Sequence, residues 1–293
     1  MMRTVGKKKQ KKKYSLLKET WRRYKKSHTA MIGLVILAVF IFLSLIAGII
    51  MPYENAIAQN RDARLQGPSS EHIFGTDAYG RDLFARILHG SRISLYIGLV
   101  TSFFTLLIGG ILGASAGYYG GWIDNVIMRI VDLFMCIPFM LLALAIVAAL
   151  GASMRNLLIA ITIASIPGTV RYIRSTVLVI TEQDFIEAAR SYGANDFRII
   201  TRYILPNSMG PIIVSATMNI SGMILSAAGL SFIGMGIQPP NPEWGSMLAT
   251  AREYMRIAPY MLYFPGVAIL LAALSFNLIG DGLRDALDPK LKD

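Results

Sequence analysis

Long apolar runs separated by short polar segments dominate the chain. Six of these runs approach or exceed the roughly 20 residues that a helix needs to cross about 30 Å of hydrocarbon. They occupy 30–51, 93–117, 125–150, 156–173, 208–230 and 260–280. Pro167 and Gly168 interrupt the fourth run, but neighbouring helices in a membrane satisfy backbone groups that a proline frees. The pattern therefore predicts an all-α transmembrane protein with six spans.

Composition places the chain in the same class. Of its 293 residues 54% are hydrophobic and 16% are charged, and the mean hydropathy is +0.50, a combination that is rare in soluble domains of this size. The apolar run from Met31 to Met51 is longer than the core of a secretory signal, so we interpret it as an uncleaved anchor. The single cysteine, Cys136, lies inside a predicted span, and no disulfide is expected.

The distribution of positive charge predicts the orientation. Twelve of the 29 Lys and Arg residues precede the first span, and basic residues are retained on the cytoplasmic side of a membrane. The N-terminus is therefore expected inside, and six crossings return the C-terminus there. A nucleic-acid arm or an anionic-lipid clamp would also use such a basic run, but the positive-inside bias alone explains it.

The same argument divides the chain. Loops 52–92 and 231–259 are expected outside, and loops 118–124 and 174–207 inside. The predicted divisions are a basic cytoplasmic tail (1–28), an anchor span with an external segment (29–92), a core of five spans (93–280) and a cytoplasmic C-terminal tail (281–293).

Small residues mark where spans are expected to pack. Gly109, Gly113 and Gly117 recur every four residues in the second span, which lets helix backbones approach closely. The fifth span has a similar series, for which close packing and a substrate path both remain open: Ser215, Ala216, Ser221, Gly222, Ser226 and Ala227.

Ionisable residues are scarce within the spans. Arg129 and Asp132 lie one turn apart in the third span and are predicted to form a local ion pair, and Pro138 offers a kink in the same helix. A secondary transporter coupled to ions would need buried acids and internal repeats, neither of which is found. Three His and one Cys are too few for a membrane enzyme, and a filter-like polar loop typical of a channel is absent.

Two further kinds of site are not predicted. The sequence has no glycine-rich phosphate-binding loop of the kind that ATPases use, so the chain is not expected to be an enzyme or to hydrolyse ATP itself. The spacing of His72, Asp77, Asp82 and His89 fits no tight set of metal ligands.

The loop 181–207 is predicted to form two short helices. Thr181 and Asp184 resemble a capping box for a helix from Glu182 to Tyr192, and Gly193 suits the left-handed position that ends it. Asn195 is expected to cap a second helix, in which Phe197, Ile200 and Ile204 share one face. Pro206 is expected to break the chain before the fifth span.

This loop resembles the EAA loop of ABC importer permeases. The resemblance rests on Glu187-Ala188-Ala189, on Gly193 after three residues, and on Ile204-Leu205-Pro206, although the family's isoleucine usually stands where this chain has Tyr203. It implies a type I importer permease fold in which this loop contacts an ATPase. The residues implied in that contact are Glu187, Ala188, Ala189, Arg190, Gly193, Ala194, Ile204, Leu205 and Pro206.

A second motif narrows the family. The stretch from His72 to Asp77, followed by Gly80-Arg81-Asp82, is similar to the external signature of dipeptide and oligopeptide permeases. Supporting stretches are 117–121, 230–234, 238–240, 244–245 and 280–289. An N-terminal anchor with an external segment before the core is similar to the C-type member of the permease pair.

The resemblance implies the assembly and its location. Two homologous permeases would form a heterodimer in the cytoplasmic membrane of a bacterium or archaeon, in contact with lipid and not with nucleic acid. Two ATPase subunits would carry the ATP and Mg, so that no cofactor is expected on this chain. An external binding protein would deliver the substrate. Peptides are implied first, with nickel chelates, oligosaccharides or opines as alternatives.

The external segment has two possible roles. It is either a gate or docking site for the binding protein, or it packs on the outer ends of the spans. Gly75, Gly80 and Gly90 are predicted turns, and 81–89 a short helix. The residues assigned to the gate or docking role are Phe74, Gly75, Thr76, Asp77, Gly80, Arg81 and Asp82.

Overall fold

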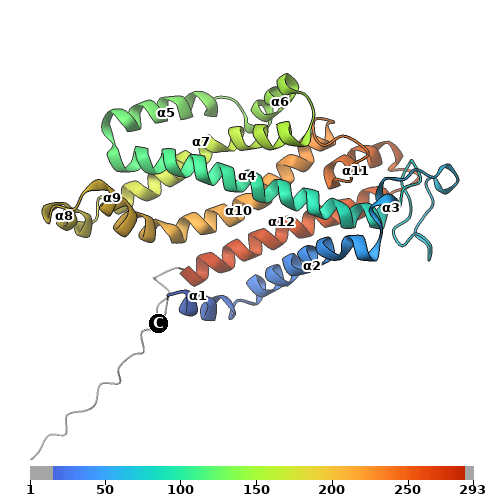
Figure 1. Cartoon of the computed structure of the whole chain (residues 1–293), viewed down its shortest axis with the longest axis horizontal. Coiled ribbons are helices and arrows are strands. Elements are labelled where there is room, and N and C mark those ends of the chain that lie inside the picture. The colour runs from blue at the N-terminus through green and yellow to red at the C-terminus, as the bar shows by residue number, and fades with distance from the viewer. Residues whose placement is uncertain (1–15, 288–293) are drawn as a thin grey trace, which may run out of the picture.

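The computed structural model describes residues 16–287, and this part of the chain is helical without a β-strand (Figure 1). Five helices are long and apolar enough to cross a membrane: α2 (His28–Ile50), α4 (Leu83–Tyr119), α7 (Met154–Thr181), α10 (Leu205–Phe232) with the short segments before it, and α12 (Tyr260–Leu287). A bent pair, α5 (Gly121–Met135) and α6 (Phe139–Leu150), forms a sixth span if counted as one.

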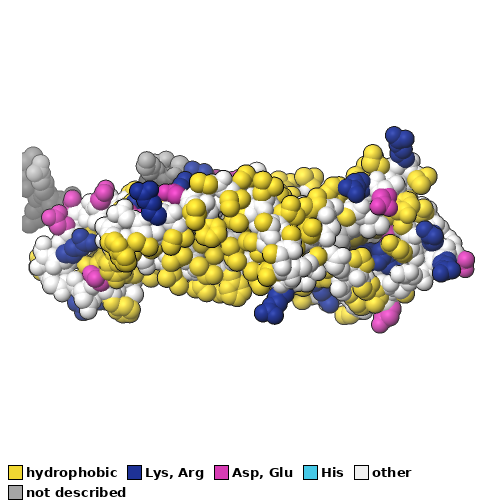
Figure 2. Space-filling model, turned by 90° about the horizontal axis from the view of Figure 1, so that it is seen from above, with side chains coloured by type: hydrophobic (Ala, Val, Ile, Leu, Met, Phe, Trp, Pro, Cys, Tyr) yellow, Lys and Arg dark blue, Asp and Glu magenta, His cyan; other side chains and the backbone are white. Residues whose placement is uncertain are grey.

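The shorter elements lie at the two ends of this bundle. α1 (Leu16–Tyr24), α8 (Asp184–Ser191) and α9 (Asp196–Ile199) are at one end, together with the C-terminal end of α12. At the other end are α3 (Tyr53–Ile57), the 3-10 turn η1 (Arg61–Ala63), α11 (Trp244–Ala251) and η3 (Arg252–Tyr254). On the face seen in Figure 2, hydrophobic side chains cover the middle of the molecule and most charged side chains lie towards its ends.

Close packing at glycines holds the long helices together. α4 packs along α7, where a Cβ on Gly113 would lie 2.6 Å from the carbonyl oxygen of Val170. α12 lies between α10 and α2: a Cβ on Gly280 would lie 2.4 Å from Met218 Cγ, and one on Gly33 would lie 2.7 Å from Leu278 Cβ. Small residues thus let these backbones approach closely, which is the usual means of helix association in lipid.

Two predicted spans have different boundaries. The second begins at Leu83 and not at 93, because Asp82 caps α4 by accepting a hydrogen bond from Ala85 N at 2.8 Å. The predicted short helix 81–89 is therefore the start of α4, and the boundary between 92 and 93 falls inside this helix. Gly90 is not a turn: it lies in α4, where a Cβ would be 3.2 Å from the indole of Trp244.

The third predicted span is not one continuous helix. α5 and α6 meet at 85°, and the break falls at Cys136, Ile137 and Pro138. Pro138 has no N–H to continue the hydrogen-bond ladder and becomes the residue before α6. The fourth run forms α7, in which Pro167 is accommodated inside the helix.

The predicted ion pair between Arg129 and Asp132 is wrong. Asp132 Oδ1 lies 2.6 Å from Arg171 Nη2 of α7, and Asp124 of α5 forms a second pair with Arg174, at 2.5 Å. The acidic face of α5 is thus directed towards α7 instead of along its own helix. These two pairs link α5 to α7, and the Asp124–Arg174 pair is the more buried of the two.

Candidate functional site

The segment between α7 and α10 forms a hairpin whose first helix is α8. The predicted capping box is absent, because the Thr181 hydroxyl donates to Val177 O at 2.6 Å within α7 and Gln183 precedes α8 without a side-chain cap. The helix consequently begins at Asp184 and not at Glu182. Its charges complement the helix dipole, with Asp184 and Glu187 in the first turn and Arg190 in the last.

Gly193 ends α8 in the left-handed conformation, with φ +73°. Ala194 N donates to Ala189 O at 3.0 Å and Gly193 N donates to Arg190 O at 2.9 Å. These two bonds form a Schellman motif, which satisfies carbonyls that a helix end would otherwise leave unpaired. The predicted stop at Gly193 is therefore present, and the turn that follows it has a defined geometry.

Asn195 caps α9, as the sequence predicts, by accepting a hydrogen bond from Arg198 N at 3.0 Å. The predicted apolar face is partly wrong: Ile199 and Ile204 are buried, whereas Phe197 is 76% exposed. Pro206 does not break the chain. The π-helical turn η2 (Ile200–Ile204), in which Leu205 N donates to Ile200 O, joins α9 to α10 in one continuous helix.

The hairpin rests on an apolar cluster at the end of α4 and α7. Ile186, Ile199 and Ile204 are buried there against Tyr118, Ile173 and Val177. The Tyr118 hydroxyl donates to Asp196 Oδ1 at 2.8 Å, and the Arg190 guanidinium lies 5.7 Å from the centre of the same ring. The helices that project from the bundle are thereby attached to two of its long helices.

The residues implied in coupling divide into two groups. Ala189 and Ile204 are buried and hold the hairpin to the bundle, and Ala194 is half-buried. The others are exposed: Glu187, Ala188, Arg190, Gly193, Leu205 and Pro206. Two large apolar side chains beside them are exposed, Tyr192 at 92%, which sequence reasoning did not single out, and Phe197 at 76%, which it placed on the apolar face. Such side chains are typical of a protein-binding surface.

The external motif, residues 72–82, forms a largely buried cluster of ion pairs at the opposite end of the bundle. Asp77 Oδ2 lies 2.6 Å from Arg81 Nε and 3.6 Å from Arg86 Nε, and Asp77 Oδ1 accepts from Tyr79 N at 2.8 Å. Asp82 Oδ2 is 2.8 Å from His72 Nδ1. The Asp and Arg side chains of this set are buried and have polar partners, as the burial of a charge requires, whereas His72 is half-buried.

Apolar and backbone contacts complete this cluster. Phe74 stacks on Phe264 of α12, with the two ring centroids 4.0 Å apart. Tyr260 OH donates a hydrogen bond to Thr76 O at 3.1 Å. Gly75 and Gly80 both have positive φ, and a Cβ on Gly80 would overlap Asn60 O. Of the assigned residues only Phe74 is partly exposed, so this set holds the segment on the spans, while Ile73 and Tyr79 are its exposed large side chains.

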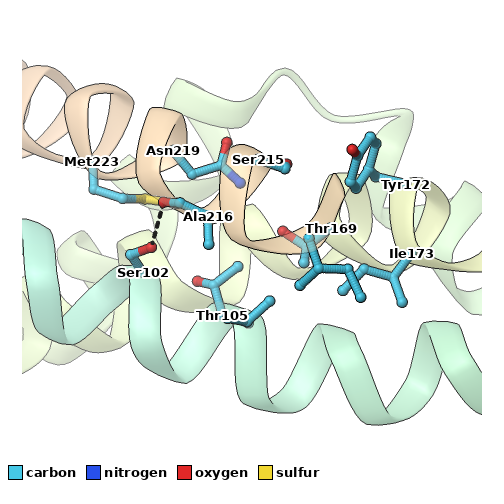
Figure 3. Close-up of a pocket in the computed structure, with 11 residues that line it drawn as sticks. Ser102, Thr105, Thr169, Tyr172, Ile173, Ser215, Ala216, Asn219 and Met223 are labelled. Carbon is cyan, nitrogen blue, oxygen red and sulfur yellow. Dashed lines mark hydrogen bonds between the residues drawn. The ribbon is translucent and has the colours of Figure 1, made fainter. Parts of the chain in front are cut away.

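A polar groove between α7 and α10 is the third feature. Its volume is about 460 Å³, and Figure 3 shows the adjoining pocket, towards which Thr105 of α4 and Thr169 of α7 extend. The polar side chains of the groove are Ser165, Thr169, Tyr172, Ser215, Asn219 and Ser226. Sequence reasoning singled out only Ser215 and Ser226, although Asn219 at the intervening helical position was a readable signal.

The glycines of the second span contact α7. A Cβ on Gly109 would lie 2.9 Å from Thr169 Cβ, and one on Gly117 would lie 2.8 Å from Arg174 O. With Gly113 they form one side of the α4–α7 contact, next to both the groove and the hairpin. The site therefore has a rigid frame.

Two models of known protein families match parts of this chain. Residues 109–293 match the family model described as "Binding-protein-dependent transport system inner membrane component", and residues 15–68 match the "N-terminal TM domain of oligopeptide transport permease C". The first of these matches covers more than half of the chain.

Similar curated proteins and a solved structure agree with those matches. A dipeptide transport system permease protein of Alkalihalophilus pseudofirmus is 48% identical over 275 residues, which are 94% of this chain and 90% of that protein. A glutathione transport system permease protein of Pectobacterium atrosepticum is also 48% identical, over 94% and 91%. The inward-facing structure of the MetNI methionine ABC transporter has a similar fold, with a TM-score of 0.59 at 20% identity, over 70% of this chain and 98% of that one.

Proposed function

The chain belongs to the family of binding-protein-dependent transport system inner membrane components, and from this premise we propose that it forms half of a pathway for small peptides. It is a multi-pass inner-membrane permease subunit of an ABC importer and not an enzyme, since ATP hydrolysis takes place in partner subunits. Its relatives are named for a dipeptide and for glutathione at equal identity. Solutes with peptide bonds are common to both.

The proposed orientation places α8 and α9 in the cytoplasm. The basic residues before α2 favour an internal N-terminus. α1, the α8–α9 hairpin and the end of α12 lie at one end of the bundle, so that all of them would face the same compartment (Figure 1). The cluster formed by the external motif, together with α11, would then face the binding protein.

The coupling role is supported by the exposed tip of the α8–α9 hairpin, whose base packs against the bundle. Glu187, Tyr192 and Phe197 are exposed, while Ile186 and Ile199 beneath them are buried against α4 and α7. A surface that projects from a rigid frame transmits a displacement of its partner to the spans. We assign the partner as an ATPase subunit that holds the ATP and Mg, and a second, homologous permease as the other half of the pathway.

The variant Glu187→Lys tests this assignment in the complete importer. It reverses one charge in the first turn of α8 without touching the buried contacts. We expect membrane insertion to be normal and peptide uptake to be lost, because ATP hydrolysis no longer drives the spans. Glu182→Lys, the same change at an exposed position before α8, is the matched control and should transport normally. Normal uptake by both variants would remove the hairpin from the coupling path.

A further inference from the structure

The polar groove between α7 and α10 lies within two membrane-spanning helices. Ser215, Asn219 and Ser226 recur at helical spacing on one face of α10, and all three are partly exposed. Among residues 16–287 no group forms a hydrogen bond with the side-chain amide of Asn219. An unpaired amide facing hydrocarbon costs several kcal/mol, so a lipid-facing position for this surface is strongly disfavoured.

Thr105 gives an independent indication of a polar occupant. Its hydroxyl oxygen is buried and has no partner among the described residues. It lines a small cavity, of about 10 Å³, that shares Thr169, Ser215 and Asn219 with the groove (Figure 3). That volume suits about one water molecule, which would have several polar partners there. Such a water would connect Thr105 to the groove.

The chemistry of the lining restricts the ligand. No Asp, Glu, Lys, Arg or His is among the residues that line the groove or the adjoining cavity. The amide of Asn219 both donates and accepts, and the Ser, Thr and Tyr hydroxyls do so as well. These groups can pair with the N–H and C=O groups of a peptide backbone, while Phe139 and Met223 supply an apolar part of the wall, and no charge is present to hold a charged terminus.

We propose that this groove is a weak binding subsite for the amide backbone of the transported solute, centred on Asn219 and Ser215. The proposal rests on the assigned role of the chain in peptide import. Neutral groups that bind amides without a fixed ion pair let the solute leave as readily as it enters. The subsite therefore tolerates varied side chains, and selection among peptides belongs to the binding protein.

Thiol labelling in the complete importer, reconstituted in proteoliposomes, tests whether the groove is aqueous. In a Cys136→Ser background, Asn219→Cys and Ser215→Cys are exposed to a charged, membrane-impermeant methanethiosulfonate. Each variant is labelled in two states of the importer, with the ATPase subunits free of nucleotide and with ATP trapped in them. Labelling is read by the mass of this chain. Val35→Cys is the control: Val35 is 57% exposed on α2, close to Gly33, which packs on α12. Thiols ionise and react in water and not in lipid.

We expect both groove positions to label in at least one state, and Val35→Cys to stay unlabelled. If both variants retain ATP hydrolysis stimulated by the binding protein but neither labels in either state, the groove is closed by a packed helix and the proposal is overturned. Protection by peptide is read at Ser226→Cys, which lines the same groove and leaves Asn219 and Ser215 in place, and labelling there that peptide never slows would overturn the subsite.

A second pair of variants examines recognition. Asn219→Leu should lower uptake about tenfold, the equivalent of one lost hydrogen bond, while stimulated ATP hydrolysis continues. Asn219→Gln keeps the amide and should retain most uptake. Equal uptake by the Leu variant and the wild type would contradict the subsite. Failure of the peptide function itself would look different, because the wild type would then import no peptide although both cysteines still label.

Discussion

Tyr118, in the last turn of α4, donates a hydrogen bond of 2.8 Å to Asp196, the first residue of α9. The two residues are 78 positions apart in the chain. The same ring lies under the Arg190 guanidinium of α8, so one side chain joins α4 to both helices of the hairpin. A movement imposed on the hairpin would thereby reach α4, which lines the small cavity beside the polar groove.

Removal of the Tyr118 hydroxyl should weaken the attachment of the hairpin to α4. A hydrogen bond to a charged group contributes about 1.5–3 kcal/mol, so Tyr118→Phe is expected to increase hydrogen exchange in 184–199 and to lower uptake per ATP hydrolysed. Asp196→Asn keeps an accepting oxygen but removes the charge, so its effect should lie between those of the wild type and the Phe variant. Unchanged exchange in the Phe variant would show that the bond does not brace the hairpin.

The turn after α8 should depend on the backbone of Gly193 alone. A Cβ there would meet no atom within 4 Å, so the positive φ is the only obstacle to a side chain. Gly193→Ala is expected to cost about 1 kcal/mol and to fray the end of α8, whereas Gly193→Asn, which tolerates this conformation, should cost less. Hydrogen exchange at Gly193-flanking amides, with the transport-to-hydrolysis ratio, measures both. Identical behaviour of the two variants would contradict this reason for the glycine.

The contact between α4 and α7 should not accept a methyl group. At Gly113 an added Cβ would lie 2.6 Å from Val170 O and 3.0 Å from Ile173 Cβ, so Gly113→Ala is expected to destabilise the protein by about 1–3 kcal/mol. Gly266→Ala, in α12, is the control, because a Cβ there meets nothing within 4 Å and alanine favours a helix. Thermal unfolding in detergent compares them. A Gly113→Ala protein as stable as the control would exclude close packing at this position.

Glu243 should make the stability depend on pH. Burial raises the pKa of its carboxyl above the ordinary 4.5, and hydrogen bonds from Gly245 N and Ser246 N oppose the rise. The folded state then binds a proton more readily than the unfolded state does. The contribution of this group is fully present below pH 4.5 and is lost as the pH rises through the raised pKa.

The variant Glu243→Gln removes that titration. Its free energy of unfolding, measured by denaturation in detergent from pH 4 upward, should fall less with rising pH than that of the wild type. Because the amide offers one accepting oxygen in place of two, the variant also loses one hydrogen bond to the start of α11, worth about 1 kcal/mol. A wild type and variant with parallel pH profiles would exclude the raised pKa.

Local features of the chain were predictable because their causes are local. The apolar runs predicted the positions of α2, α7, α10 and α12, since span length depends only on consecutive residues. Gly193 and Asn195 were read correctly as a stop and a cap, because both act within a few residues of their own backbone. Motifs of the loop and of the external segment also indicated the permease family that the comparisons show.

Features for which several partners compete were not predictable in this way. Thr181 pairs within α7 and not with α8, and Pro206 is accommodated because η2 widens the helix before it. The sequence left open whether the external motif is a gate or docking site or packs on the spans, and the structure shows that its Asp and Arg side chains are buried and paired. In each case several partners lie within reach of the group, and only the folded chain shows which one it uses.

By itself the sequence determined that the chain spans a membrane, that a glycine-stopped hairpin interrupts the spans, and to which permease family both belong. Hydrophobic length and backbone conformation are properties of short segments, and these fix such features. Only the tertiary structure decided that Asp132 pairs with Arg171, that α5 and α6 meet at 85°, and that Thr105 and Asn219 line one small cavity beside the polar groove. These arrangements arise from contacts between helices far apart in the chain, where small residues decide which backbones approach.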